Sequence, residues 1–149
     1  MIRALATALM LFGASAAAQT SNAPAPARGA LAGAWAFETN AHRITGCIIR
    51  GDALLRARAE ADSYDVEMRV AETCPDGGAY RAEEACLARL DRGTLNVACR
   101  LVRATPPNYN PDQFSLTIDS AEAMHGRLVD HGAWNEPVRW RKSTGALVS

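Results

Sequence analysis

The 149-residue chain has little net charge, few aromatic residues and no long hydrophobic run. Its 16 basic residues balance 16 acidic ones. Non-specific nucleic-acid binding needs a net basic surface that releases counterions, so this balance argues against a nucleic-acid partner. The apolar run Ala4 to Phe12 is about half of the roughly 20 residues that cross a bilayer as a helix. We therefore expect no membrane span.

Motifs for catalysis are also missing. The sequence contains no Gly-x-Ser-x-Gly elbow, no glycine-rich phosphate loop and no His-Glu-x-x-His. Its three histidines are His42, His125 and His131, and the last two lack the i, i+4 spacing of a helical metal pair. If the apolar residues around His125 point inward, its own side chain faces water. We predict no catalytic residues, no metal and no cofactor, and hence a protein that is not an enzyme.

Lysine is nearly absent as well, because 15 of the 16 basic residues are arginine. The simpler explanation is the base composition of the genome. The alternative is bidentate recognition of carboxylate or phosphate groups, for which the guanidinium fork is suited. The sequence alone leaves both explanations open.

What is present at the N-terminus indicates export. Arg3 precedes the apolar run, and Ala16-Ala17-Ala18 offers the small residues that signal peptidase accepts. We therefore expect a signal peptide over 1–18 and a periplasmic or secreted protein with a net charge of about −1 after loss of Arg3. Residues 19–30 are rich in Ala, Pro and Ser, which predicts a flexible linker. The folded domain is expected over 31–142, followed by a disordered tail over 143–149.

Alternating apolar and polar residues dominate the predicted domain. Tyr64, Val66, Met68 and Val70 are separated by polar residues, and similar runs occur near 94–101, 114–118 and 138–141. A period of two indicates strands with one buried and one wet face. We expect strands near 33–39, 44–50, 53–60, 64–73, 81–90, 94–103, 113–119, 124–130 and 136–141, with a turn at Arg50-Gly51-Asp52. The predicted fold is all-β, a small antiparallel up-and-down barrel of about eight strands.

Two segments compete with this prediction. Residues 53–61 and 79–90 are rich in good helix formers. The flanking alternation favours strands in both, and helices remain the alternative. Alternation also predicts that Trp35 and Trp140 are buried, while Trp134 lies in or near a loop.

The four cysteines predict a disulfide-stapled domain. An even count in an exported chain indicates two bridges, and the spacing is far wider than the close pairs of a zinc site. If Arg92-Gly93 is a two-residue hairpin loop, Asp91 pairs with Thr94 and Cys86 lies opposite Cys99. The bridges would then be Cys86–Cys99 and Cys47–Cys74. The alternative pairs Cys74 with Cys86 and Cys47 with Cys99.

Gly33-Ala34-Trp35 at the first strand, with Arg139 and Arg141 at the last, resembles lipocalin-like (calycin) β-barrels. In that family a tryptophan on the first strand packs under an arginine from the end of the barrel. The resemblance implies a barrel-closing core of Trp35, Trp140, Arg139 and Arg141, in which a guanidinium stacks on an indole. It also implies a small apolar ligand inside the barrel.

Two further resemblances concern shorter segments. The start Leu31 to Trp35, followed by Cys47, resembles periplasmic metalloprotease inhibitors of the Inh type. In that family a segment before the barrel plugs the protease cleft, a role that residues 19–30 would take here. The segments 109–116, 124–128 and 137–141 resemble uncharacterised exported proteobacterial proteins, which implies no activity.

The loop Tyr109-Asn110-Pro111-Asp112 is the most distinctive connection. Tyr109, Asn110 and Asp112 form a candidate recognition loop, because tyrosine and asparagine suit contact surfaces. The alternative is a stiff structural connection in which Asn110 or Asp112 forms a hydrogen bond with its own backbone.

Together these features predict an exported, non-enzymatic binding protein of the cell envelope, which binds a protein or resembles a hydrolase inhibitor. A lipocalin-like carrier of a small apolar ligand is the alternative.

Overall fold

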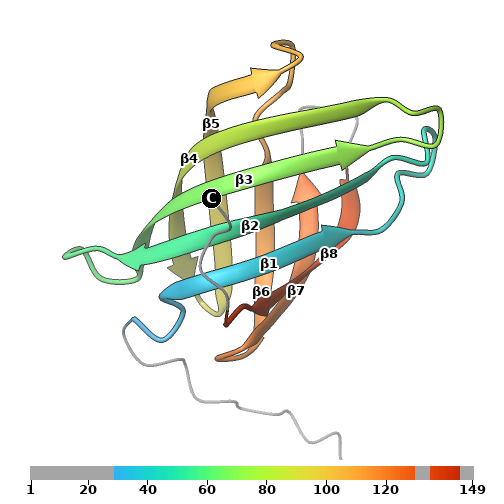
Figure 1. The fold of residues 1–149 in the computed structure, drawn as a ribbon. Coiled ribbons are helices and arrows are strands. Elements are labelled where there is room, and N and C mark those ends of the chain that lie inside the picture. Colours follow the sequence, from blue (N-terminus) through green and yellow to red (C-terminus); the bar gives the residue numbers. More distant parts are fainter. Residues whose placement is uncertain (1–28, 130–134, 145–149) are drawn as a thin grey trace, which may run out of the picture.

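The computed structural model describes residues 29–129 and 135–144, which form a closed antiparallel barrel (Figure 1). Each strand pairs with its sequence neighbours, and β1 pairs with β8 to close the barrel. The strands are β1 (Gly33–Thr39), β2 (Ile48–Ala57), β3 (Ser63–Thr73), β4 (Ala79–Asp91), β5 (Thr94–Thr105), β6 (Gln113–Ser120), β7 (Ala123–Val129) and β8 (Asn135–Lys142). The predicted all-β, up-and-down barrel of about eight strands is confirmed.

Several predictions fall on residues that the structure does not describe. These are the signal peptide, the linker before Gly29, His131, Trp134 and the tail beyond Thr144. In the part of the chain that is described, no helix is long and apolar enough to cross a bilayer.

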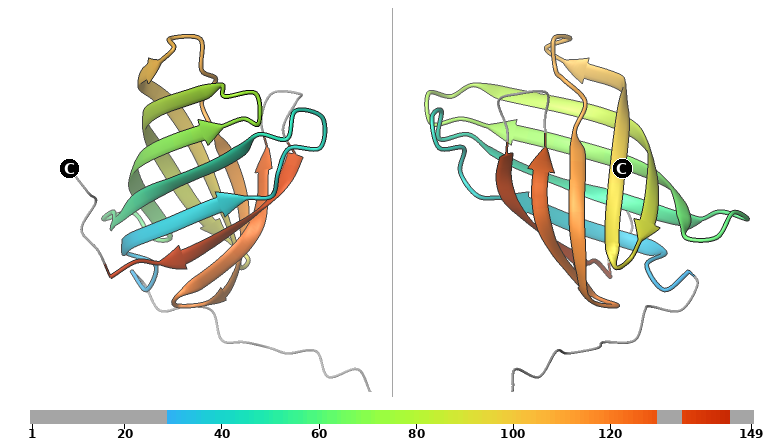
Figure 2. Two further views of the ribbon diagram at one scale, coloured as in Figure 1. Left: turned by 45° about the vertical axis from the view of Figure 1, so that its right-hand side comes forward. Right: turned by 180° about the vertical axis from the view of Figure 1, so that it is seen from behind.

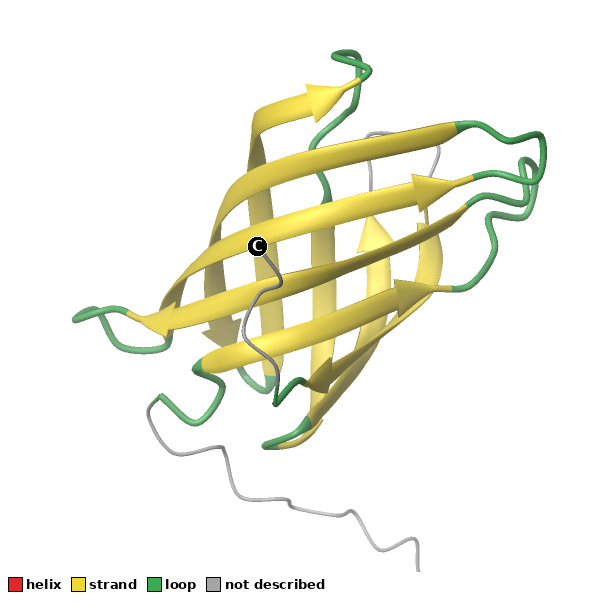
Figure 3. Ribbon diagram, viewed as in Figure 1, coloured by secondary structure: helices red, strands yellow, loops and turns green. Residues whose placement is uncertain are grey.

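The two segments with helix-forming composition are not helical. Residues 53–57 belong to β2, 58–61 form a connection, and 79–90 lie in β4 (Figure 3). Every residue of β4 from Ala79 to Arg89 pairs with β3, and residues from Arg81 onward also pair with β5. Pairing on both sides outweighs local helix propensities that amount to a few tenths of a kcal/mol per residue. The strand prediction is confirmed for 79–90 and for the first half of 53–61.

The predicted turn at Arg50-Gly51-Asp52 is wrong. These residues lie inside β2, which merges two of the nine predicted strands, while Ile44 to Cys47 belong to the preceding loop. Gly51 pairs with Phe37 of β1, and a Cβ atom there would come within 2.5 Å of the Phe37 ring. A Cβ there would also meet the backbone carbonyl of Arg69, so the glycine permits the close approach of this carbonyl and of the Phe37 ring and does not mark a chain reversal.

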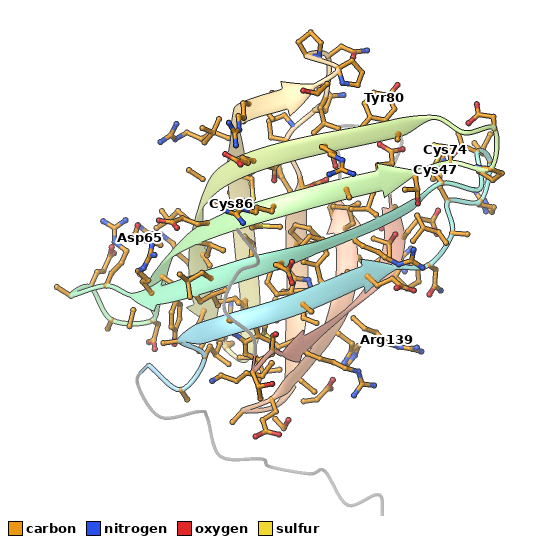
Figure 4. The ribbon with its side chains drawn as sticks, in the orientation of Figure 1. Cys47, Asp65, Cys74, Tyr80, Cys86 and Arg139 are labelled. Carbon is orange, nitrogen blue, oxygen red and sulfur yellow. A yellow bond between two sulfur atoms is a disulfide. The ribbon has the colours of Figure 1, made fainter. Side chains whose placement is uncertain are left out.

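Both disulfides follow the preferred pairing, Cys86–Cys99 and Cys47–Cys74. Asp91 pairs with Thr94 around Arg92 and Gly93, whose φ angles of 48° and 85° are both positive. A two-residue hairpin turn with positive φ at both central residues matches the twist of the strands, and it places Cys86 opposite Cys99. Cys47 and Cys74 lie together where β2 begins and β3 ends (Figure 4). The alternative pairing is excluded.

Side chains fill the middle of the barrel. Trp35 and Trp140 are both 0% exposed, as predicted. The rings of Phe37 and Phe114 lie 5.0 Å and 5.3 Å from that of Trp140, and 5.4 Å from each other. An eight-stranded barrel encloses an interior that side chains can just fill. The two views of Figure 2 show the eight strands wrapped around a common interior.

Candidate functional site

One end of the barrel is closed around Trp35. Its indole Nε1 donates a hydrogen bond to the Leu31 carbonyl at 2.8 Å, and Leu31 is itself fully buried. The Nζ atom of Lys142 lies 5.5 Å from the centre of the Trp35 rings and donates to the Ala30 carbonyl at 3.2 Å. A cation therefore does cover this tryptophan, as in the resemblance, but it is a lysine.

The predicted role of Arg139 and Arg141 is wrong. Both side chains are exposed on the outer face of β8, and Figure 4 shows Arg139 pointing away from the barrel. Because Trp140 points inward, its two neighbours must point outward, and Lys142 returns to the inner face. The alternation that predicted this strand also predicts that Arg139 and Arg141 point outward and that Lys142 points inward.

Two of the three side chains proposed for the recognition loop, Tyr109 and Asp112, are buried. Tyr109 is 8% exposed and Asp112 is 3% exposed, whereas Asn110 faces solvent. The Tyr109 hydroxyl donates to the two Asp112 carboxylate oxygens, which lie at 3.1 Å and 3.3 Å. The ring of Tyr109 also lies 6.2 Å from that of Tyr80 on β4. Tyr109 and Asp112 are therefore part of the end of the core, and only Asn110 of the predicted three can meet a partner.

Glu84 completes this end and was missed from the sequence. Its side chain on β4 is 2% exposed, and its Oε1 accepts a hydrogen bond from the Asp112 amide at 3.1 Å. Its Oε2 is buried and has no hydrogen-bond partner among the described residues. Burial raises the pKa of Glu84 to about 7, opposed by the bond from the Asp112 amide. The available signal was its place between the inward residues Ala82 and Cys86.

Tyr109 stays protonated under all ordinary conditions. Burial raises the pKa of its hydroxyl, and the charges of Asp112 and Glu84 raise it further. The hydroxyl therefore remains a donor to Asp112 and does not act as a base. This cluster holds the segment before β6, and its three side chains are each at most 8% exposed.

Two groups of residues bring potential metal-ligating atoms together in the described chain. They are Cys47, Glu72 and Cys74, and Glu84, Cys86 and Cys99. In each group both sulfur atoms belong to a disulfide. A disulfide sulfur is not a thiolate, so neither group offers the ligand set of a zinc site.

The two described histidines are held by neighbouring side chains. His42 is 7% exposed, and its Nδ1 lies 2.8 Å from the Thr45 hydroxyl. His125 faces solvent from β7, as predicted, with its Nδ1 2.7 Å from a carboxylate oxygen of Asp119. Neither histidine belongs to a group of potential metal ligands among residues 29–129 and 135–144. The two rings therefore form no shared site.

The outer face of the barrel carries a charged groove of about 1030 Å³ that crosses β8 and β1 to β5. Two rows of outward residues line it, each following the cross-strand pairing. The first row is Arg141, Ala36, Asp52, Arg69, Glu83 and Arg103. The second row is Arg139, Glu38, Arg50, Ala71, Arg81 and Thr105. We call these two rows the arginine groove.

Ion pairs within the arginine groove use only some of its guanidinium groups. Arg50 Nε lies 2.6 Å from a Glu38 oxygen, and Arg103 pairs with Glu83. In each pair the hydrogen bond that the guanidinium donates to the glutamate carboxylate is the main cause of a raised arginine pKa. Both pairs are solvent-exposed, and exposed pairs of this kind contribute little to stability. They orient side chains more than they stabilise the barrel.

Comparison with known proteins identifies the fold alone. No protein-family model and no curated protein matches the sequence. Among solved structures, the chain is similar to a redesigned β-barrel, mFAP1, bound to DFHBI, with a TM-score of 0.55 and 16% identity over 76% of this chain and 95% of that one. It is also similar to the redesigned barrel b11L5F_LGL, with a TM-score of 0.59 and 16% identity over 77% and 93%.

A third match is a fluorescence-activating β-barrel designed de novo, with a TM-score of 0.55 and 12% identity over 80% of this chain and 100% of that one. At such identities the likeness extends to the architecture and not to the residues that bind a ligand. The chain is thus a small β-barrel that resembles designed barrels, some of them solved with a bound ligand.

Proposed function

We propose that this protein works outside the cytoplasm as a non-enzymatic binding protein, and that it binds another protein with its outer surface. The observation that carries the proposal is the filled interior. Phe37, Phe114 and Trp140 pack at 5.0 to 5.4 Å in the middle of the barrel, and Trp140 is 0% exposed. A carrier of a small apolar ligand needs a pocket that buries most of the ligand. The side chains occupy that space here.

Two disulfides support the proposed compartment. Disulfides form and persist in oxidising compartments, and the described part of the chain has no free cysteine. The expected leader over 1–18 supports the same assignment. Residues 19–30 remain the proposed inhibitory segment if the partner is a hydrolase, in line with the resemblance to Inh-type inhibitors.

The test is a comparison of bound species. The mature protein, isolated from periplasmic extract under native conditions, is analysed by native mass spectrometry and by chemical cross-linking. We expect a complex with one protein partner at a fixed stoichiometry, and no small molecule on the barrel. Deleting residues 19–30 should abolish the complex if that segment inhibits a hydrolase, and should leave it intact if the barrel wall is the interface. A stoichiometric apolar ligand without a protein partner would contradict the proposal.

A further inference from the structure

The arginine groove holds more positive charge than its own carboxylates neutralise. It contains six arginines, Arg50, Arg69, Arg81, Arg103, Arg139 and Arg141. Only three acids, Glu38, Asp52 and Glu83, lie among them, so the local balance is 6 − 3 = +3. The whole chain, in contrast, has a formal net charge of zero. Positive charge is therefore concentrated on this face relative to the rest of the chain.

Part of this charge is available to a partner. No carboxylate of residues 29–129 or 135–144 is within ion-pairing distance of Arg81, Arg139 or Arg141. All three side chains are exposed. Arg139 and Arg141 are two residues apart on β8, and Arg81 lies on β4, on the other side of β1 to β3. These three cations thus flank the groove from both sides.

We propose that the arginine groove binds an acidic segment of the partner protein, with aspartate or glutamate carboxylates engaged by Arg81, Arg139 and Arg141. This inference rests on the proposed function and names the chemistry of the partner. A guanidinium presents parallel N–H donors that match a carboxylate, which gives geometric selectivity in addition to charge. Ala36 and Ala71 stand within the two rows, where a short side chain lets the backbone of a bound segment approach the barrel wall.

The pattern of charge favours a protein over a polyphosphate or nucleic acid. Glu38 lies between Arg139 and Arg50 in one row, and Asp52 and Glu83 flank Arg69 in the other. A continuous polyanion would meet repulsion from each of these acids. A protein segment places its carboxylates at intervals and can offer donors or basic groups in between, so it complements an alternating surface.

The test uses the mature protein and a defined probe, a synthetic peptide of alternating glutamate and alanine. Nuclear magnetic resonance titration should move the amide and arginine side-chain signals of the two rows, with an affinity that falls as salt screens the charges. The double variant Arg139→Glu/Arg141→Glu should weaken peptide binding by at least about tenfold, because it reverses the charge of two arginines that make no ion pair within the described chain. A glutamine–alanine peptide should not bind.

The control is Arg92→Glu, one charge reversal of the same kind as each of the two in the double variant, at the β4–β5 hairpin tip, where the side chain is 90% exposed and pairs with Asp91. It should leave peptide binding unchanged. Binding that Arg92→Glu weakens as much as the double variant does, or peptide shifts outside the groove, would overturn the inference. So would single-stranded DNA or polyphosphate that outcompetes the peptide.

A second measurement separates this inference from the proposed function. If the native partner complex survives in Arg139→Glu/Arg141→Glu, the groove is not the interface, although the protein still binds a partner. If the unmodified protein has no protein partner at all, the proposed function itself is wrong. Circular dichroism of the double variant should match that of the parent, because both side chains are exposed.

Discussion

At the end of the barrel where β1 begins, Leu31 and Trp35 are fully buried and the charge of Lys142 lies over the indole. At the other end, the segment before β6 brings Tyr109 and Asp112 onto the buried carboxylate of Glu84. The first end is closed by apolar area and a cation. The second is closed by hydrogen bonds among groups that each cost free energy to bury.

This difference predicts how each end responds to change. Burial of apolar area near Trp35 does not depend on pH, and losing it leaves a cavity. The stability of the Glu84 end depends on protonation of this carboxyl group, because one of its oxygens is buried without a hydrogen-bond partner in the described chain. The apolar end should therefore dominate the free energy of unfolding, and the polar end should dominate its dependence on pH.

The largest effect should come from Trp35→Ala. The indole is 0% exposed and donates a hydrogen bond to the Leu31 carbonyl. Its loss therefore removes both core packing and the hydrogen bond that holds the segment before β1. We expect a decrease of about 3 to 5 kcal/mol in the free energy of unfolding, measured by urea denaturation. Trp35→Phe should lose clearly less, because most of the ring volume remains. A decrease below about 1 kcal/mol for Trp35→Ala would show that packing at this end contributes little to the free energy of unfolding.

The next effect concerns the disulfide at the opposite end. Replacing Cys47 and Cys74 together by alanine should cost about 2 to 5 kcal/mol in urea denaturation. The same change at Cys86 and Cys99 is the control within the molecule. Their sequence separations are 27 and 13, and the longer loop should cost about 0.6 kcal/mol more when its bridge is removed. Equal costs, or the reverse order, would indicate that native contacts and not chain entropy set the contribution of each bridge.

How far these regions could be predicted from the sequence differs between the two ends. The alternation in β3 and β8 places Trp140 and Val66 inside and predicts the barrel, and the Arg92-Gly93 turn predicts Cys86–Cys99. Such local patterns suffice wherever one face of a strand is apolar and the other is polar. The same rule, applied strictly to β8, predicts that Lys142 and not Arg139 or Arg141 is the cation over the Trp35 ring.

The polar end could not be predicted in the same way. Glu84 occupies an inward position that the alternation marks, but its partner Asp112 lies 28 residues away in a segment without a periodic pattern. Tyr109 looks like a surface residue by composition and is buried by a tertiary contact with Tyr80. The turn predicted at Gly51 failed for a related reason, because the positions of the Arg69 carbonyl and the Phe37 ring, on two other strands, explain this glycine. Contacts between segments that are distant in the sequence determine the burial and the roles of these residues, and local patterns do not reveal such contacts.

A smaller effect tests the proton at the polar end. Since the pKa of Glu84 is raised from 4.5 to about 7, the folded state binds a proton that the unfolded state has already released. This stability is fully present below about pH 4.5 and is lost as the pH rises through about 7, with a size on the order of 3 kcal/mol. Glu84→Gln should remove this dependence while its amide oxygen still accepts from Asp112.

The measurement is the difference between the unfolding free energies of the parent and of Glu84→Gln across about pH 4 to 8. Glu72, whose pKa burial also raises, is present in both proteins and cancels in the difference. The parent should lose stability relative to the variant as the pH rises. A flat difference would mean that Glu84 is ionised in the fold and finds a partner for its second oxygen.

The smallest effect separates Lys142 from the two arginines of the resemblance. Lys142→Met keeps the aliphatic stem but removes the charge over Trp35 and the bond to the Ala30 carbonyl, so it should cost about 1 kcal/mol. Arg139→Met and Arg141→Met should each change the free energy of unfolding by less than about 0.5 kcal/mol, because both side chains face outward. Lys142→Arg should retain most of the stability, since a guanidinium also stacks on an indole. If Arg141→Met proved more costly than Lys142→Met, the cation that closes the Trp35 end would be an arginine after all, and the inward position of Lys142 would contribute packing alone.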